Sequence, residues 1–155
     1  MLKINDMQQH FHNSNLIEGF DSKEADECLL RAWEYLDKQE TISKGVVCRT
    51  QKIATLHQRD LRPDWRGYYR KIPVWIGGRE ATDYGEIDSR MRLWINQIKS
   101  LSPKLSHIDF EHIHPFVDGN GRTGRLLMWW HEVQLGQQPT LIKFEDRHEY
   151  YKWFR

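Results

Sequence analysis

The sequence predicts a mainly α-helical fold that carries one short β-hairpin. Three observations support this fold class. Apolar residues recur at helical spacing through most of the chain, residues that cap helices flank these segments, and one stretch between glycines is rich in β-branched and aromatic residues. No repeat, low-complexity tract or Gly/Ser linker divides the chain, so one domain is expected.

Two helices are expected before the hairpin. Asp21 and Glu24 resemble a capping box, and the apolar residues that follow predict a helix over 22–39 because they recur at helical spacing: Ala25, Cys28, Leu29, Ala32, Trp33 and Leu36. A second helix is expected over 48–61.

The segment 68–76 has the composition of a strand. It is rich in β-branched and aromatic residues, with Gly67 before it and Gly77-Gly78 after it, and Pro73 suits a turn or an edge strand. A short, exposed hairpin is therefore expected here.

The second half of the chain predicts further helices. One helical face is formed by Ile87, Met91, Trp94, Ile95 and Ile98. Ser102 and Pro103 suit the N-cap and first position of the next helix, which continues to Ile113 and stops at Pro115.

The stretch RLLMWWHEVQL, residues 125–135, is apolar on nearly every side and ends at Gly136, as expected of a helix buried among others. A last short helix is indicated by Phe144, Tyr151 and Phe154.

Composition limits the classes of function. The 155 residues, 39% hydrophobic and 29% charged, suffice for one compact domain over 1–155. The net charge of +1 argues against a nucleic-acid or anionic-membrane partner. No apolar stretch approaches the roughly 20 residues of a membrane-spanning helix, and the first residues lack a signal core. Cys28 and Cys48 form no CxxC pattern, so reduced thiols and a cytoplasmic location are expected.

The segment IHPFVDGNGRTGR, residues 113–125, predicts a phosphate site. Its glycines lie where the second of two helices begins, and free N–H groups at a helix start attract anions. Gly119 and Gly121 allow close backbone approach, and Asn120 tolerates a left-handed conformation while offering amide donors. Arg122 and Arg125, three residues apart, are expected on the same side of the helix, where both could bind a polyphosphate.

Two further side chains suggest reaction chemistry. Asp118 suits Mg²⁺, which typically binds one or two carboxylates together with substrate phosphates. His114, with an ordinary pKa of about 6.5, is able to accept a proton near neutral pH. The segment thus combines a base, a metal ligand and a phosphate cradle.

Other interpretations of this segment exist. Singly, the glycines suit a turn, His114 a capped structural group, and Asp118 an Asx-turn with Gly119. The glycines also match GxGxxG, but that fingerprint requires a preceding strand, whereas a helix and Pro115 precede it here. A transition-metal site is a further alternative, with four candidate ligands: His107, His112, His114 and Asp118.

The residues HPFVDGNGRTGR, from His114 to Arg125, resemble the HPFxDGNGRxxR signature of the Fic family at every fixed position. The text GYYRKIPVWIGG is similar to the flap that precedes the signature in that family. The resemblance covers roughly residues 10–153 and implies a Fic-type helical bundle with a β-hairpin flap. The segment ATDYGEIDSR after the flap lacks the proline-rich run of many relatives, so the rim of the target groove is expected to differ.

The resemblance implies a protein adenylyltransferase that uses ATP and Mg²⁺ to place AMP on a Ser, Thr or Tyr hydroxyl of a target protein. It makes His114 the general base and Asp118 the metal ligand. Gly119, Asn120 and Gly121 become the anion hole, Arg122 and Arg125 bind the polyphosphate, and Phe116 anchors the loop in the core. The flap is expected to dock an extended target segment by β-augmentation through Tyr69, Val74, Trp75 and Ile76.

A second stretch, SNLIEGF, resembles the family's inhibitory motif (S/T)xxxE(G/N), with Ser14, Glu18 and Gly19 at its fixed positions. It implies an inhibitory helix over 10–20, in which Glu18 pairs with Arg125 and takes the place of a phosphate. The structural alternative is a capping-box-like pair of Asn15 and Glu18, with Gly19 ending a short helix.

Alternatives to AMP transfer stay open at this level. The same site could remove AMP from a protein, or serve both directions, with Glu18 positioning a water. Phosphate-transferring Doc-like members resemble the chain less, because their second anion-binding glycine is replaced whereas Gly121 is intact. A nucleotide-dependent protein-binding module without transfer is the alternative of another class. The seven Trp and six Tyr also leave room for a homo-oligomeric interface.

Overall fold

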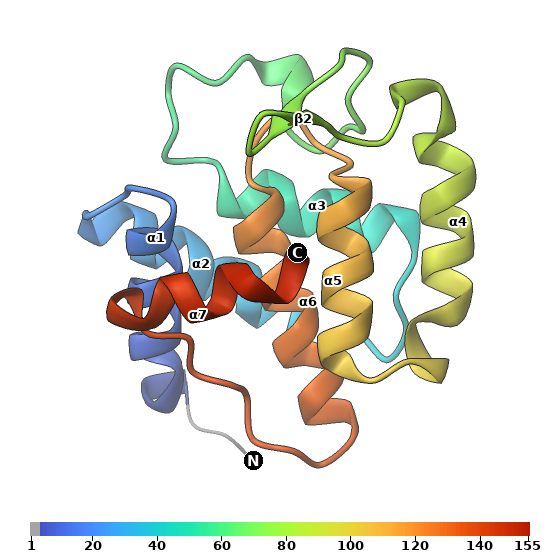
Figure 1. Ribbon diagram of the computed structural model, residues 1–155. Coiled ribbons are helices and arrows are strands. Elements are labelled where there is room, and N and C mark those ends of the chain that lie inside the picture. The colour runs from blue at the N-terminus through green and yellow to red at the C-terminus, as the bar shows by residue number, and fades with distance from the viewer. Residues whose placement is uncertain (1–3) are drawn as a thin grey trace.

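The computed structural model describes residues 4–155 and confirms a mainly helical fold with one hairpin (Figure 1). The first three residues, which the predicted domain includes, lie outside the described residues. The α-helices are α1 (Gln8–Ile17), α2 (Lys23–Asp37), α3 (Lys44–Ala54), α4 (Ile87–Gln97), α5 (Pro103–Ile113), α6 (Asn120–Gln134) and α7 (Arg147–Tyr151). The strands are β1 (Trp75–Ile76) and β2 (Arg79–Glu80). Short 3₁₀ turns occupy Ile4–Met7, Pro63–Trp65, Tyr84–Glu86, Ile98–Ser100, Phe144–Asp146 and Lys152–Phe154.

Helix α6 lies in the middle of the molecule and contacts α1, α2, α3 and α5 (Figure 1). Trp129 and Trp130 are almost fully buried, and their indole N–H groups donate to the carbonyls of Thr140 and Gln39, each at 2.9 Å. Such satisfied donors allow large aromatic rings to fill a core without an unpaired polar group. The predicted central helix is confirmed, including its end near Gly136, whose φ is 72°.

One predicted helix cap and one predicted helix start are wrong. Ser22, not Asp21, caps α2, because its hydroxyl accepts the N–H of Ala25 at 3.1 Å. The helix predicted over 48–61 instead begins after Ser43, whose hydroxyl accepts the N–H of Val46 at 3.2 Å, and ends at Ala54. A polar cap, rather than the first apolar residue, sets each start. Ser102 caps α5 as expected and accepts the N–H of Leu105 at 3.2 Å.

The hairpin lies further along the chain than the predicted 68–76. Only β1 falls in that segment, and Trp75 pairs with Glu80 and Ile76 with Arg79. Gly77 and Gly78 form the turn with φ of 54° and 81°, the combination that a tight two-residue hairpin turn requires. The residues before Val74 are not a strand because they pack against the loop between α5 and α6, as described below. The paired residues are exposed, as expected.

Within residues 4–155, none of the helices has the length and apolar character needed to cross a bilayer. Cys28 and Cys48 are buried free thiols. Burial raises the pKa of Cys48 to about 11.

Candidate active site

The loop between α5 and α6 is held by its own asparagine. The Asn120 amide accepts the N–H of Phe116 at 2.9 Å and donates to the Phe116 carbonyl at 2.8 Å, while the Phe116 ring is fully buried. Asn120 begins α6 in a right-handed conformation, so the expectation of a left-handed Asn120 with a free amide is wrong. Its backbone N–H, at the start of α6, has no partner within the helix.

The two glycines of the loop are needed for different reasons. Gly119 has a φ of 80°, and a Cβ there would lie 2.7 Å from the Thr55 methyl carbon. Gly121 lies in the first turn of α6, and a Cβ there would overlap Glu18 Oε1 and lie 3.0 Å from Arg125 Nη1. The space beside Gly121 at the positive end of α6 therefore contains a carboxylate oxygen.

Arg125 is almost fully buried and is surrounded by oxygen acceptors. Its Nη2 lies 2.6 Å from Glu18 Oε1 and donates to the Ser14 carbonyl at 3.1 Å. Its Nε donates to the Ser14 hydroxyl at 2.8 Å, and its Nη1 donates to the Tyr150 hydroxyl at 3.1 Å. A buried guanidinium without such partners would be strongly disfavoured.

The segment with Ser14 and Glu18 is the end of α1. The N–H groups of Gly19 and Phe20 donate to the carbonyls of Leu16 and Asn15 at 3.0 and 2.9 Å, which is a Schellman turn, and Gly19 has a φ of 84°. The alternative capping box of Asn15 and Glu18 is wrong, because Glu18 follows the last helical residue. Gly19 does end the helix, and that ending directs Glu18 toward Arg125.

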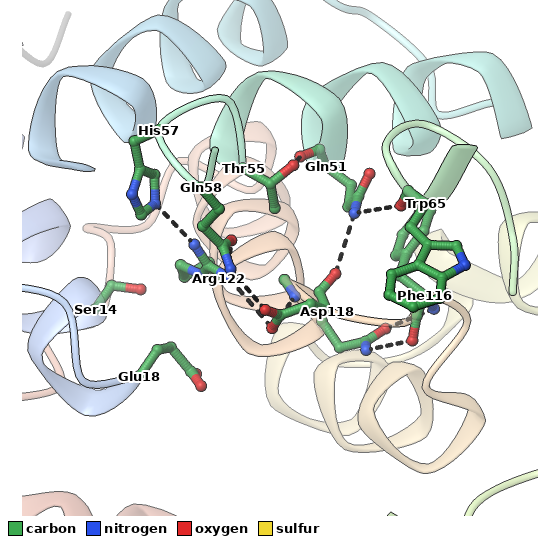
Figure 2. Close-up of polar contacts among 12 residues, drawn as sticks. Ser14, Glu18, Gln51, Thr55, His57, Gln58, Trp65, Phe116, Asp118 and Arg122 are labelled. Atoms are coloured by element: carbon green, nitrogen blue, oxygen red, sulfur yellow. Dashed lines mark hydrogen bonds and ion pairs between the residues drawn. The ribbon is translucent and has the colours of Figure 1, made fainter. Parts of the chain in front are cut away.

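Arg122 is also fully buried, but it has a separate set of partners (Figure 2). Its Nη1 lies 3.1 Å from His57 Nε2, and its Nη2 donates to Gln58 Oε1 at 2.8 Å. The Phe20 ring covers the guanidinium at 4.7 Å. The spacing had suggested that both arginines act together at the mouth of the helix. In the structure, each arginine instead has its own group of partners.

Asp118 is a half-exposed carboxylate with a fixed orientation. Its Oδ1 accepts the N–H of the next residue, Gly119, at 2.7 Å. An Asx-turn would instead bond the N–H two residues on, so that alternative is not confirmed. Its Oδ2 accepts from Gln58 Nε2 at 2.7 Å, and its backbone carbonyl accepts from Gln51 Nε2 at 3.1 Å. The side chain is 47% exposed, so its remaining lone pairs are accessible.

His114 ends α5 with a φ of 51°, the left-handed conformation that non-glycine residues rarely adopt. Its Nδ1 lies 3.3 Å from the Glu111 carbonyl, so a proton on Nδ1 leaves Nε2 free to accept another. Burial lowers the pKa of His114 to about 4, and the imidazole is neutral at physiological pH. A neutral, oriented imidazole is suited to act as a base.

Arg70 holds the His114 loop against the segment before the hairpin, and no sequence pattern had singled it out. Its backbone N–H donates to the Pro115 carbonyl at 2.8 Å, and its buried guanidinium donates to the His114 and Ile72 carbonyls at 2.7 and 2.9 Å. A cation at the carbonyl end of α5 is also favoured by the helix dipole. Arg70 and Lys71 are both charged in this stretch, and nothing in the sequence distinguishes the buried one from its neighbour.

Tyr150, from α7, completes the surroundings of Arg125 and was not predicted. Its hydroxyl lies 2.7 Å from His107 Nε2. Burial lowers the pKa of His107 to about 3, so this histidine is a neutral partner, and burial raises the pKa of nearby Glu111 to about 8. His107 and Glu111, which lie near Arg125, are therefore both mostly uncharged at neutral pH.

A pocket of about 620 Å³ opens in front of these groups. Its lining comes from the end of α1, the hairpin and the residues after it, the ends of α5 and α7, and the start of α6: Ile17, Glu18, Ile76, Arg79, Glu80, Ala81, Thr82, Glu111, His112, His114, Gly121, Arg125, Tyr150, Tyr151 and Phe154.

The predicted flap residues have different environments. Ile76 lines the pocket, and Trp75 is 62% exposed on the hairpin. Tyr69 lies outside the hairpin and packs on the Phe116 ring, with centroids 5.7 Å apart. Val74 precedes β1, and its carbonyl accepts the N–H of Ala81 at 2.9 Å. The structure thus brings Trp75 and Ile76 to the hairpin but not Tyr69.

The transition-metal alternative is not supported. Among the residues that the structure describes, no three His, Cys, Asp or Glu side chains are grouped so as to hold a metal ion. His107 faces Tyr150, and His112 Nε2 lies 3.3 Å from the Phe154 carbonyl. These histidines do not converge with Asp118.

Comparison with known proteins identifies relatives with the same fold. Residues 41–131 match the model of the Fic/DOC family. A protein adenylyltransferase Fic from Nematostella vectensis is 32% identical over 124 residues, which cover 72% of this chain and 29% of the relative. A second protein adenylyltransferase Fic, from Drosophila grimshawi, is 36% identical over 115 residues, which cover 66% of this chain and 24% of the relative. The chain therefore spans less than a third of the length of either relative.

Solved structures show the same architecture over nearly the whole chain. A Fic domain containing signaling protein from Bacteroides thetaiotaomicron has a TM-score of 0.78 and 21% identity, covering 96% of this chain and 71% of that one. A Fic-1 fragment from C. elegans has a TM-score of 0.72 and 16% identity, covering 95% of this chain and 54% of that one.

Proposed function

Because the chain belongs to the Fic/DOC family, we propose that it transfers AMP from ATP to a Ser, Thr or Tyr hydroxyl of a target protein, and that Glu18 restrains this activity. The curated relatives named above carry the name protein adenylyltransferase, which supports the class of reaction. The observation that carries the proposal is the position of Glu18: a carboxylate oxygen lies between the start of α6 and the Arg125 guanidinium. That position suits a phosphate oxygen equally well.

His114 acts as the general base in this reaction. Its Nε2 accepts the proton of the target hydroxyl, whose oxygen bonds to the α-phosphorus of ATP. The bond between the α-phosphorus and the oxygen that leads to the β-phosphate breaks, and pyrophosphate leaves. The Nδ1 contact with the Glu111 carbonyl fixes the tautomer that this step requires.

The start of α6 binds the phosphates. The backbone N–H groups of Asn120 and Gly121 serve as the anion hole, because the first N–H groups of a helix have no partners within it. The N–H of Gly119, which the resemblance had included, donates to Asp118 Oδ1 instead. Arg125 contacts the outer phosphates once Glu18 leaves. Arg122, whose Nη2 lies 3.5 Å from Asp118 Oδ1, adds positive charge to the site. Fixed donors of this kind need little reorganisation during the reaction.

Asp118 fits the role of the Mg²⁺ ligand. Its Oδ2 accepts one hydrogen bond, from Gln58, and its Oδ1 accepts from Gly119 and, at 3.5 Å, from Arg122. The half-exposed side chain lies beside the phosphate site. One carboxylate together with phosphates and waters is a donor set that Mg²⁺ prefers. When bound, the metal neutralises and aligns the phosphate oxygens.

Glu18 competes with ATP for Arg125, and the hairpin presents the target. Removing the carboxylate frees the arginine for a phosphate group, so the segment 10–20 serves as an inhibitory helix. The exposed edge of β1, with Trp75 and Ile76, offers backbone groups to an extended segment of the target beside the pocket.

Labelled ATP tests the proposal. The chain and its Glu18→Gly variant are incubated with Mg²⁺, cell lysate and ATP labelled with ³²P at either the α- or the γ-phosphate. We expect label on protein only from the α-position, more of it with the variant, and none with the Glu18→Gly/His114→Ala double variant. Label from the γ-position would indicate phosphate transfer, and no label from any sample would favour a nucleotide-dependent binding module; either result refutes the proposal.

A further inference from the structure

We propose that Gln58 is a positioning residue for Asp118: its amide keeps the carboxylate apart from Arg122 and available to a divalent cation. This inference rests on the proposed role of Asp118 as the metal ligand. Gln58 lies outside the signature segment, 60 residues before Asp118 in the sequence, and it joins two members of that segment (Figure 2).

The chemistry of the two partners fixes the direction of the Gln58 amide. Arg122 can only donate hydrogen bonds, so the amide oxygen faces its Nη2 at 2.8 Å. A carboxylate can only accept, so the amide nitrogen faces Asp118 Oδ2 at 2.7 Å. The reverse orientation would place a donor against a donor and an acceptor against an acceptor.

The amide thereby makes the shorter contact with each of the two groups, and the direct ion pair between Arg122 and Asp118 stays long. Arg122 Nη2 and Asp118 Oδ1 are 3.5 Å apart, which is longer than a strong charge-assisted hydrogen bond. Arg122 is fully buried, so it attracts any neighbouring carboxylate with little screening. Without Gln58, we expect Asp118 to turn toward Arg122 and to present less negative charge to a cation.

The backbone around Gln58 is well suited to hold its side chain in place. Its N–H donates to the Thr55 carbonyl at 3.0 Å, and its own carbonyl accepts from the Leu61 N–H at 3.1 Å and from the Arg66 guanidinium. These turns follow the early end of α3 at Ala54. A continued helix through residue 58 would replace them, so the unexpected end of α3 is what positions the amide.

Gln51 provides a matched control on the same segment. Like Gln58 it is a buried glutamine that reaches the loop, but its amide binds only backbone groups: the carbonyls of Asp118 and Trp65 and the N–H of Gly67. A variant at Gln51 therefore removes buried hydrogen bonds of the same kind without touching the Asp118 carboxylate.

The test measures Mn²⁺ binding by electron paramagnetic resonance in the full chain with Glu18→Gly, together with α,β-methylene-ATP, which does not react. Gln58→Met preserves side-chain length and removes both hydrogen bonds. Since partners of metal ligands typically contribute 10–100-fold to affinity, we expect Mn²⁺ binding to weaken by about tenfold. The Mg²⁺ concentration for half-maximal transfer should rise by a similar factor. Gln51→Met should lower the melting temperature and leave the Mn²⁺ affinity within about twofold.

A second pair of variants tests the mechanism. If Gln58 acts by keeping Arg122 from Asp118, then Gln58→Met should have a much smaller effect on Mn²⁺ binding in an Arg122→Met background. Should Gln58→Met fail to fold, Gln58→Asn, which is too short to reach both partners, replaces it. Unchanged Mn²⁺ affinity, or the same loss in both backgrounds, overturns this inference. Absence of Mn²⁺ and nucleotide binding in the Glu18→Gly chain itself would instead refute the proposed function.

Discussion

Replacing Glu18 by Gln should raise the transfer rate and lower the stability together. The substitution keeps the length of the side chain and removes its charge, while the other Arg125 contacts, to Ser14 and Tyr150, persist. A hydrogen bond between charged groups contributes about 1.5–3 kcal/mol, against about 1 kcal/mol for a neutral one. The expected difference of about 0.5–2 kcal/mol in the contact that excludes ATP corresponds to a rate increase of about 2- to 30-fold at low ATP.

The Glu18→Gly variant removes the contact completely, and its expected gain is about 10- to 150-fold by the same conversion. Because Arg125 stays buried without its carboxylate, the free energy of unfolding should fall by about 1.5–3 kcal/mol. Glycine also adds backbone freedom to the unfolded chain, about 1 kcal/mol, and for that reason Gln is the cleaner change.

The assay compares initial rates of label incorporation at sub-saturating ATP with urea unfolding of the same samples. Glu27→Gln is the control, because Glu27 is half exposed and its nearest cation, Lys23, is 4.0 Å away. Neither the rate nor the stability of this control should change measurably. A loss of stability at Glu18 without any gain in rate would show that the ion pair is structural and would refute the competition with ATP.

Three further predictions concern pH and the glycines. Burial lowers the pKa of His114 to about 4, so the transfer rate of the Glu18→Gly chain should stay level from pH 8 to about pH 5.5; a decline centred near 6.5 would contradict the shift. Burial raises the pKa of Glu111 from 4.5 to about 8, so its protonated form contributes stability that is complete below pH 4.5 and lost as the pH rises through 8. Glu111→Gln should therefore lose less unfolding free energy between pH 6 and pH 9 than the parent in urea titrations, and parallel curves would disprove the assignment. Gly119→Ala should destabilise by more than Gly78→Ala, because both have positive φ near 80° but only at Gly119 does the new Cβ meet another group. Backbone strain costs about 1–2 kcal/mol in each, and equal losses in thermal unfolding would argue against the contact with Thr55.

Local signals predicted the parts of the fold that depend on neighbours in the sequence. The Ser102-Pro103 start of α5 and the end of α6 near Gly136 are set within a few residues, and both were correct. The end of α3 and the place of the hairpin were not, because they depend on contacts with the distant loop after α5. The start of α3 was also missed, although its cap, Ser43, is a local signal. Arg70, which pairs with that loop, makes residues before Val74 unavailable as a strand.

The same distinction applies to the candidate site. The pairing of Glu18 with Arg125, separated by 107 positions, was anticipated only through the resemblance of two short motifs. Gln58, Arg70 and Tyr150 belong to no such motif, and each reaches the site from a different part of the chain. Single amides, guanidinium groups and hydroxyls carry no local pattern, so only the three-dimensional arrangement shows what they contact.

Helix α6 explains why the site requires so many auxiliary groups. Its apolar end is fixed in the core by Trp129 and Trp130, so its first turn, with Arg122 and Arg125, is buried as well. Two buried cations are tolerated only where each has acceptors. Arg122 makes its shortest contacts with neutral acceptors at His57 and Gln58, which nothing in the proposed reaction displaces, and its ion pair with Asp118 is long. Arg125 instead pairs with Glu18, which directly follows α1 and is 33% exposed. The exchangeable partner is therefore the one at Arg125, and we expect ATP to replace Glu18 there while the contacts of Arg122 persist.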